Sequence, residues 1–373
     1  MCKVYNSIGS LTTIKSHLHK HNVNEFKSLN EIIDFQKSYT NIQEQIISNH
    51  SLLIEQEKKT LDKEIAQLNV SINTRKSEVE QQLQLELEML KQQLDELPST
   101  HSNIFQKFIF CVKKIWIKRN IRDYELNFNA KIRCSVRQLT AKLTNKNNRY
   151  QFIVSHFKNA VNESSLSQLR ELDRKKRIID EINTTIYGAL GEQKVANELE
   201  NLSDDYILIN DYSYSFHPPI YNRQKNDYIK SIQIDHLLIS PAGIFLIETK
   251  NWSEYSLNNL SLRSPVEQIN RTNFVLFKIL AGEITNSKLK LSQHHWGARK
   301  VPIKNLIVLI NQKPSEEFQY VKILTLRELL GYVKWFKPSL SGKDTQMIAD
   351  YLLRLNNIRM KRTKKIHKDS YWP

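Results

Sequence analysis

Residues 234–250 read IDHLLISPAGIFLIETK, and this stretch decides the fold of the carboxy-terminal half of the chain. Two runs of mainly apolar and β-branched residues are separated by the tetrapeptide Ser-Pro-Ala-Gly. Ser240, Pro241 and Gly243 suit positions i, i+1 and i+3 of a type I turn. The stretch therefore predicts a β-hairpin.

The hairpin register determines which polar side chains meet. If the loop contains only two residues, Asp235 lies directly opposite Glu248, and Lys250 shares a face with Glu248. A bulge at Gly243 would shift this register by one residue. Opposed carboxylates on apolar strands repel each other, and their burial needs a compensating cation. Lys250 supplies one positive charge, and a divalent ion held by carboxylate oxygens is the natural second.

A helix expected just before the sheet carries a further acidic candidate. Glu192 shares a helical stripe with Val195 and Leu199, so it lies on the face that should meet the core. Gly188 and Gly191 flank it and permit close approach to the sheet. We expect Glu192 to join the hairpin carboxylates. The alternative is a purely structural ion pair with the lysine of the hairpin.

A second helix is expected after the hairpin. Its start, Ser264-Pro-Val-Glu267, fits a capping box with proline at the first helical position. We interpret Glu267 as a cap. Gln268, in the first turn, could orient a water molecule or a phosphate. Arg271 either contacts phosphate or is simply solvated.

The wider pattern predicts an α/β domain with a central sheet flanked by helices. The strands are expected at 206–210, 231–239, 243–251 and 306–310, and the helices at 181–202, 265–282, 325–336 and 342–358. The tail beyond Arg359 is basic, and we expect it to be poorly ordered. Its candidate nucleic-acid contacts are Lys361, Arg362, Lys364 and Lys365.

The segment 41–97 predicts a long helix with a coiled-coil seam. Apolar residues alternate in steps of four and three at Leu61, Ile65, Leu68 and Ile72, and again at Leu83, Leu87, Leu90, Leu94 and Leu97. Pro98 should end the helix. We expect the seam to mediate self-association into a homo-oligomer, and the alternative is a helix folded back on its own chain.

Residues 104–182 look helical and strongly basic. One face carries Phe105, Phe108, Ile109, Val112 and Trp116 at helical spacing. Such a face packs against a neighbouring helix or lies on a membrane surface, and we favour packing. The basic side could then follow phosphates.

Composition limits the partners and the compartment. The 373 residues carry a formal net charge of +16, which favours nucleic acid first and an anionic membrane surface second. The three cysteines, Cys2, Cys111 and Cys134, have no paired spacing, so a reducing cytoplasm is expected. We see no signal peptide and no spanning helix.

His17, His19 and His21 alternate, and alternating histidines do not converge on a helix, so no metal role is expected there. The same holds for the adjacent pair His294–His295.

These residues together resemble the NERD family, the nuclease-related domain. The resemblance rests on Gly188-Ala-Leu-Gly-Glu192, on 234–239, on Gly243-Ile-Phe-Leu-Ile-Glu-Thr-Lys-Asn-Trp252 and on Gln268. It implies a restriction-endonuclease-like mixed sheet of the PD-(D/E)xK superfamily. By resemblance, Asp235 and Glu248 bind Mg²⁺ or Mn²⁺, Lys250 activates the attacking water, Glu192 assists as a further ligand, and Gln268 fills a polar position. One departure is the stretch 212–230, which we interpret as a substrate loop.

We divide the chain into an amino-terminal helical segment (1–40), a coiled coil (41–98), a basic helical region (99–180), the nuclease-like domain (181–338) and a C-terminal helix with a basic tail (339–373). The first hypothesis is a metal-dependent nuclease acting on DNA rather than RNA, and bacterial anti-phage settings are common for such architectures. The second is an inactive nucleic-acid-binding scaffold, and the third is a membrane-surface protein. The intact set of acidic residues favours the nuclease hypothesis, because buried carboxylates cost stability unless they bind something.

Overall fold

The computed structural model describes residues 1–97, 104–252, 263–282, 291, 300–314 and 316–369. The chain divides into two compact units, one formed by residues 1–35 together with 175–373 and the other by residues 36–174. The first 35 residues thus belong to the α/β unit, although the sequence suggested a separate helical segment.

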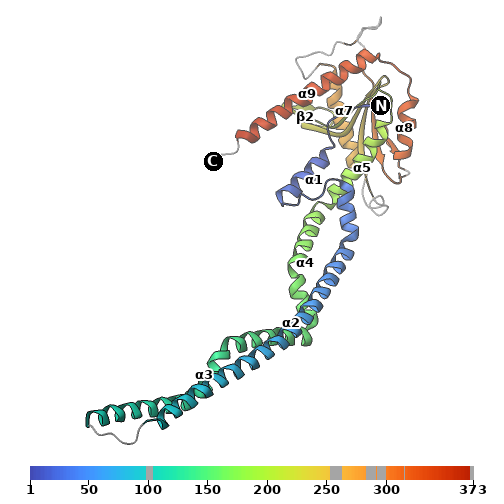
Figure 1. Ribbon diagram of the computed structural model, residues 1–373. Coiled ribbons are helices and arrows are strands. Elements are labelled where there is room, and N and C mark those ends of the chain that lie inside the picture. The colour runs from blue at the N-terminus through green and yellow to red at the C-terminus, as the bar shows by residue number, and fades with distance from the viewer. Residues whose placement is uncertain (98–103, 253–262, 283–290, 292–299, 315, 370–373) are drawn as a thin grey trace. The chain divides into compact units, whose positions relative to one another are not determined.

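The α/β unit is built on a six-stranded mixed sheet in the order β1-β2-β3-β4-β5-β6 (Figure 1). The strands are β1 (Lys3–Tyr5), β2 (Ile207–Asn222), β3 (Asp227–Ser240), β4 (Gly243–Lys250), β5 (Ile303–Leu309) and β6 (Lys322–Thr325). β2, β3 and β4 pair antiparallel, whereas β1 and the last two strands pair parallel to their neighbours. The predicted mixed sheet is confirmed, but β1 and β6 were not expected because each is too short to show a periodic pattern.

The predicted hairpin register is confirmed. β3 and β4 pair from Ser240↔Gly243 to His236↔Ile247, which excludes a bulge at Gly243. Gly243 has φ +113°, a conformation that favours glycine, and a Cβ there would lie 2.4 Å from the Pro302 carbonyl oxygen. The tight turn therefore fixes which side chains face each other further along the two strands.

The stretch 212–230 is a β-hairpin arm rather than a loop. β2 and β3 stay paired out to Tyr221↔Tyr228 and Asn222↔Asp227, with one irregularity between Ser215 and Ile220. The expectation of a loop is therefore wrong, and Pro218 and Pro219 lie within the irregular part of the pairing, where a strand tolerates proline.

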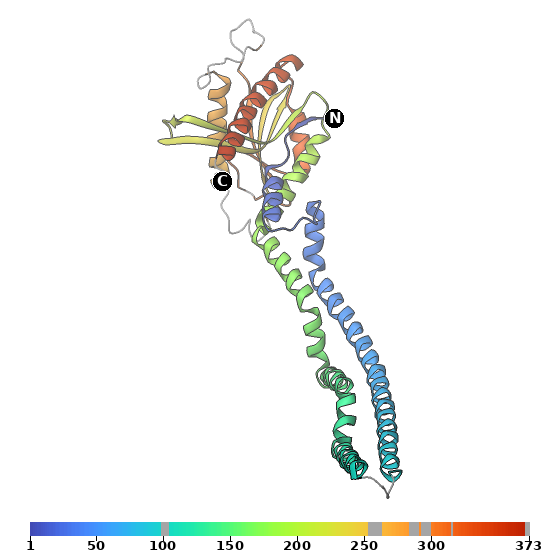
Figure 2. The same cartoon turned by 60° about the vertical axis from the view of Figure 1, so that its left-hand side comes forward.

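Helices cover both faces of the sheet (Figures 1 and 2). On one face, α7 (Arg263–Leu280) and α9 (Gly342–Asp369) share a buried core with residues such as Ile234 and Leu246. On the other face, α5 (Asn183–Glu200) and α8 (Leu326–Trp335) pack on Leu238 and Phe245. Burial of each such side chain stabilises the fold by about 1.5–3 kcal/mol. The short helix α1 (Gly9–Lys20) packs on α5 and the end of α4.

The second unit is an antiparallel arrangement of α2 (Leu29–Asp95), α3 (Ile104–Ser155) and α4 (Phe157–Glu181). Ion pairs between α2 and α3 show the antiparallel order, because the residue numbers fall along α2 as they rise along α3: Lys91–Glu125, Lys146–Glu64 and Arg149–Glu57. Ile54 and Leu61 pack with Ile153 and Val161. The alternative of a helix folded back on its own chain is therefore confirmed. Association between copies through this seam stays a prediction. Pro98 lies outside the described residues, and α2 ends at Asp95.

The apolar face of α3 is exposed. Phe105, Phe108 and Trp116 are 75%, 69% and 59% exposed, whereas Ile117 is buried. We predicted that this face packs against a neighbouring helix. The prediction is wrong, because none of the described helices of this chain covers these side chains. No described helix is long and apolar enough to span a bilayer.

The last helix is longer than the sequence suggested. α9 continues to Asp369, beyond the expected end at residue 358, and the sequence between these points contains neither proline nor glycine. The helix thus extends into the basic tail, and the poor order expected beyond Arg359 stays a prediction. The side chains of the four tail residues named as nucleic-acid contacts lie outside the described residues.

Candidate active site

The two hairpin carboxylates lie where β3 and β4 stop pairing. The ladder ends at His236↔Ile247, one residue before Asp235 and Glu248 would meet. Beyond that point the backbone N–H of Thr249 donates to Asp235 Oδ2 at 2.7 Å, so a side chain replaces the missing ladder bond. Glu248 is only 2% exposed. The hairpin thus holds two acidic side chains at an opening between its strands.

Both oxygens of Glu248 have partners. Lys250 Nζ donates to Oε1 at 2.7 Å, and Gln268 Nε2 donates to Oε2 at 3.2 Å. Lys250 comes from the same strand, two residues on, and Gln268 comes from the first turns of α7. The expectation that Gln268 belongs to the site rested on the family motif, and the geometry gives it a direct contact.

Glu192 approaches the cluster from α5. Its Oε1 accepts a hydrogen bond of 2.7 Å from Ser10 Oγ, at the start of α1. Burial raises the pKa of Glu192, the Ser10 hydrogen bond opposes this, and the neighbouring Asp211 and Glu248 carboxylates raise it further. Sequence reasoning missed Ser10, and no local signal could have found it, because it lies 182 residues from its partner.

Asp211 is a second residue that sequence reasoning missed. It adopts φ +47° in the middle of β2, beside the unpaired Asp235. Its carboxylate lies so close to Gly9 that a Cβ there would be 2.4 Å from Asp211 Cγ. An anion is favourable at the amino-terminal end of a helix, and Gly9 is the first residue of α1.

The charges of the cluster are strongly coupled. Burial raises the pKa of Asp235 well above its usual range, and the carboxylates of Glu248 and Glu192 raise it further. Burial alone would lower the pKa of Lys250, but Glu248, Asp235 and Glu192 outweigh it, so that pKa is raised. Lys250 is therefore an ammonium that faces three acidic groups.

This donor set suits a hard divalent cation, because oxygen ligands predominate and the acidic groups outnumber the ammonium. Asp235 and Glu248 are the residues that could hold such an ion. Among the described residues, the one trio of potential ligand atoms within 4.8 Å of one another lies elsewhere. Glu192 therefore does not complete a preassembled three-carboxylate set, and its contribution as a third ligand stays a prediction.

His236 follows Asp235 on β3 and is fully buried. Its Nδ1 lies 2.8 Å from Asn210 Oδ1, and Asn210 Nδ2 donates to the Asn6 carbonyl. That second bond orients the amide, so Nδ1 of His236 is the donor. Burial lowers the pKa of His236 to about 3, so the ring is neutral. It supports the strand and is not placed to hold the ion.

A groove of about 650 Å³ lies between the β2–β3 arm and α7. Gln268 lines this groove and also contacts Glu248, so this one side chain connects the wall of the groove with the acidic cluster. Arg271 lines it too, with its Nη2 2.7 Å from Asp227 on the arm. Arg271 therefore ties the arm to α7 and would have to release Asp227 to contact a phosphate.

The start of α7 differs from the prediction. The helix begins at Arg263, so Ser264 lies in the first turn and not at the cap position. Glu267 is exposed on the same turn and lines the groove. Of the two histidine groups, His294–His295 lies outside the described residues, whereas His17 and His21 are brought together, contrary to the expectation from their spacing.

Fold and site together define an α/β domain in which a central hairpin carries an Asp–Glu–Lys cluster. Residues 187–310 match the NERD family model, the nuclease-related domain. The chain thus contains a nuclease-related domain, and the resemblance inferred from its motifs is confirmed. No curated protein and no solved structure matches the chain.

Proposed function

We propose that the protein is a metal-dependent nuclease that hydrolyses phosphodiester bonds, with DNA as its substrate. The observation that carries this proposal is the hairpin cluster, in which buried Glu248 is bonded to Lys250 Nζ at 2.7 Å beside the coupled carboxyl group of Asp235. Structural ion pairs do not need a second buried acid, whereas a hydrolytic metal site does. A role in defence against phage stays a prediction from the family resemblance alone.

The residues divide the chemistry among them. Asp235 and Glu248 would hold Mg²⁺ or Mn²⁺, which when bound lowers the pKa of a water molecule and polarises the phosphoryl oxygen. The Lys250 ammonium would hydrogen-bond the attacking oxygen and stabilise the charge of the pentavalent transition state. Gln268, which lines the groove, can orient a phosphate oxygen through its amide. None of these roles requires a covalent enzyme intermediate.

The decisive test is cleavage by a lysine variant. Lys250→Ala should lower the cleavage rate about a hundredfold or more, because a charge aimed at the transition state is lost. DNA affinity should change little, since the loss of one phosphate contact alters the slope of log K against log salt concentration by at most about one unit. Lys194→Ala, at an exposed position on α5, is the matched control and should cut at the wild-type rate. The assay compares plasmid, linear and single-stranded DNA with RNA, in Mg²⁺, Mn²⁺ or EDTA.

Two outcomes would refute the proposal. If Lys250→Ala cuts as fast as the wild type in a preparation free of contaminating nucleases, the site is wrongly assigned. If the wild type binds DNA tightly but does not cut it in the presence of any of the metals, the chain is an inactive scaffold. A thermal melt separates misfolding from lost chemistry. Mg²⁺ should raise the melting temperature of the wild type but hardly that of Asp235→Ala.

A second candidate function is attachment to an anionic membrane surface through α3. The exposed aromatic side chains of Phe105, Phe108 and Trp116 favour it, since apolar side chains in water are costly and bilayer interfaces accept aromatic rings. The same stretch carries three lysines: Lys107, Lys113 and Lys114. Apolar rings beside lysines complement an anionic lipid surface better than they complement DNA.

Liposome flotation tests this attachment. The protein should float with vesicles that contain phosphatidylserine and not with neutral ones, and Phe108→Ser should weaken flotation. Leu52→Ser is the control, because Leu52 is equally apolar and 61% exposed on α2. If Phe108→Ser leaves flotation unchanged, or instead abolishes a dimer seen by light scattering, membrane attachment through this face is wrong.

A further inference from the structure

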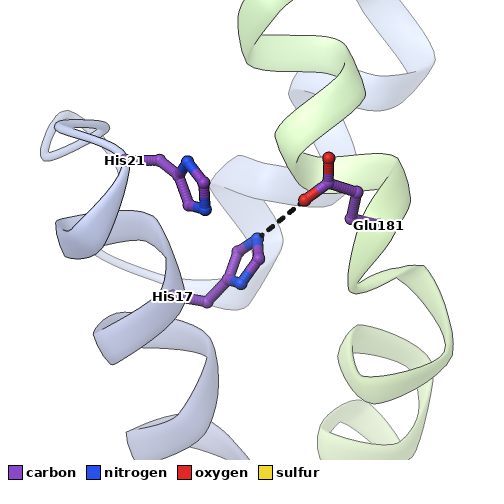
Figure 3. A group of neighbouring side chains, drawn as sticks. All are labelled: His17, His21 and Glu181. Carbon is purple, nitrogen blue, oxygen red and sulfur yellow. Dashed lines mark ion pairs between the residues drawn. The ribbon is translucent and has the colours of Figure 1, made fainter.

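Two histidines near the end of α1 face the last residue of α4 (Figure 3). His17 and His21 are one helical turn apart, and their ring centroids are 4.7 Å from each other. Glu181 points toward them from α4. One potential ligand atom of each of the three side chains lies within 4.8 Å of the other two. All three residues belong to the α/β unit.

The contact between His17 and Glu181 has the spacing of two metal ligands. His17 Nε2 lies 3.4 Å from Glu181 Oε2, and this nitrogen is buried without a hydrogen-bond partner. A charge-assisted hydrogen bond would close to about 2.7–2.9 Å. Two ligands on a tetrahedral zinc ion, each about 2.0–2.1 Å from the metal, lie roughly 3.3–3.4 Å apart. The observed separation matches the second arrangement.

The helices that carry these residues are already held together. Ile14 and Leu18 of α1 pack with Ile178 of α4 and Ile182 at the α4–α5 junction in one buried cluster. An ion at the end of α1 therefore needs only small side-chain rotations and no rearrangement of the backbone. Sites that are preorganised in this way lose little conformational entropy on binding.

We propose that His17, His21 and Glu181 bind a divalent transition-metal ion, with Zn²⁺ as the best fit, and that this ion ties the end of α1 to the end of α4. Two imidazoles and one carboxylate suit zinc, whereas Mg²⁺ prefers oxygen ligands alone. The site is thus chemically distinct from the carboxylate cluster on the hairpin. Its fourth position is left for water.

The ion would act on the same two elements that position the nuclease cluster. Ser10, which donates to Glu192, lies seven residues before His17, about 10 Å along α1. Glu181 precedes the first residue of α5, the helix that carries Glu192, by two positions. Holding α1 on this junction holds Ser10 on Glu192. This regulatory consequence rests on the proposed function, whereas the metal site itself does not.

Metal titration of the full-length protein tests the site. Metal-free protein is titrated with Zn²⁺, and with Co²⁺ as a spectroscopic probe, in saturating Mg²⁺ so that the hairpin carboxylates are occupied. The wild type should bind with visible bands typical of tetrahedral Co²⁺. His17→Gln, His21→Gln and Glu181→Gln should each weaken binding about tenfold or more. The matched control is His19→Gln, at an exposed position on the same helix, which should bind like the wild type.

Comparing variants excludes other sources of binding, since Cys111 and Cys134 are exposed and can also take up zinc. Equal affinity in the wild type and His17→Gln overturns the site, as does full affinity in Glu181→Gln. A melt without metal checks that each variant is folded. The regulatory step is tested separately: Zn²⁺ should change Mg²⁺-dependent cleavage by the wild type and not by His17→Gln. An identical response in both overturns the coupling and leaves the binding result standing.

Discussion

Gly191→Ala should destabilise the α/β unit even though alanine is the better helix former. Gly191 lies where α5 passes the end of β4. A Cβ there would lie 2.8 Å from Asn251 Cβ and 3.4 Å from side-chain carbons of Thr249 and Ile310. Asn251 cannot move aside freely, because its Nδ2 donates to the Tyr187 carbonyl at 2.7 Å. The helix itself must therefore move away from the sheet.

The magnitude follows from this overlap. Ordinary contact begins near 3.4 Å, so α5 has to shift by about 0.6 Å. Overpacking of this kind costs about 1–3 kcal/mol, and the gain in helix propensity offsets about 0.5–1 kcal/mol. Gly188→Ala is the matched control, because nothing lies within 4 Å of its Cβ position on the same helix. It should stabilise the unit by about 0.5–1 kcal/mol. The difference between the two variants removes the propensity term and isolates the contact.

Urea denaturation followed by tryptophan fluorescence measures this difference, since four of the five tryptophans belong to the α/β unit. Cleavage gives an independent readout, because a shift of α5 moves the adjacent Glu192. Gly191→Ala should cut more slowly, and Gly188→Ala should cut at the wild-type rate. Equal stability of the two variants would refute the close approach of α5 to β4 and with it the placement of Glu192.

Three further outcomes are expected. Ser10→Ala should slow cleavage roughly fivefold, equivalent to about 1 kcal/mol for the lost hydrogen bond, and Ser16→Ala, at an exposed position on the same helix, should not. Ile153→Ala should cost the helical unit about 2–5 kcal/mol because Ile153 is 0% exposed, whereas Val154→Ala, 48% exposed, should cost little in the same melt. Acid should weaken the α/β unit below about pH 6.5, since the unfolded chain protonates the imidazole of His236 while the folded state, with a pKa of about 3, does not. This residue should contribute a loss of about 1.4 kcal/mol per pH unit between those values, and His236→Gln should have a shallower stability profile on the acid side.

The sequence was sufficient wherever the determining interactions are local. The turn residues Ser240 and Gly243 specify the hairpin register, and the register brings Asp235 to the end of the ladder beside Glu248. Lys250 follows on the same strand, so its contact with Glu248 needs no long-range information. This part of the site could therefore be predicted from the order of the residues along one hairpin.

The parts that could not be predicted depend on contacts between distant segments. Ser10 reaches Glu192 only because α1 packs on α5, and no periodic pattern specifies that packing. The histidines show a different limit. Alternation along the sequence was taken to keep them apart, yet His17 and His21 are themselves one turn apart and share a face. Only the fold adds Glu181, which no spacing rule connects to them.

The arrangement also bears on what the nuclease-related segment needs from the rest of the chain. The family match covers 187–310, which contains Glu192, the hairpin and Gln268. Strand β1, however, extends the sheet beyond β2, and α1 supplies the hydroxyl that fixes Glu192. Both come from the first 35 residues, which belong to the α/β unit. A carboxylate with a raised pKa is sensitive to the loss of one hydrogen bond, because that bond is what favours its charged form. The amino-terminal segment therefore contributes directly to the chemistry of the acidic site, although it lies outside the matched residues.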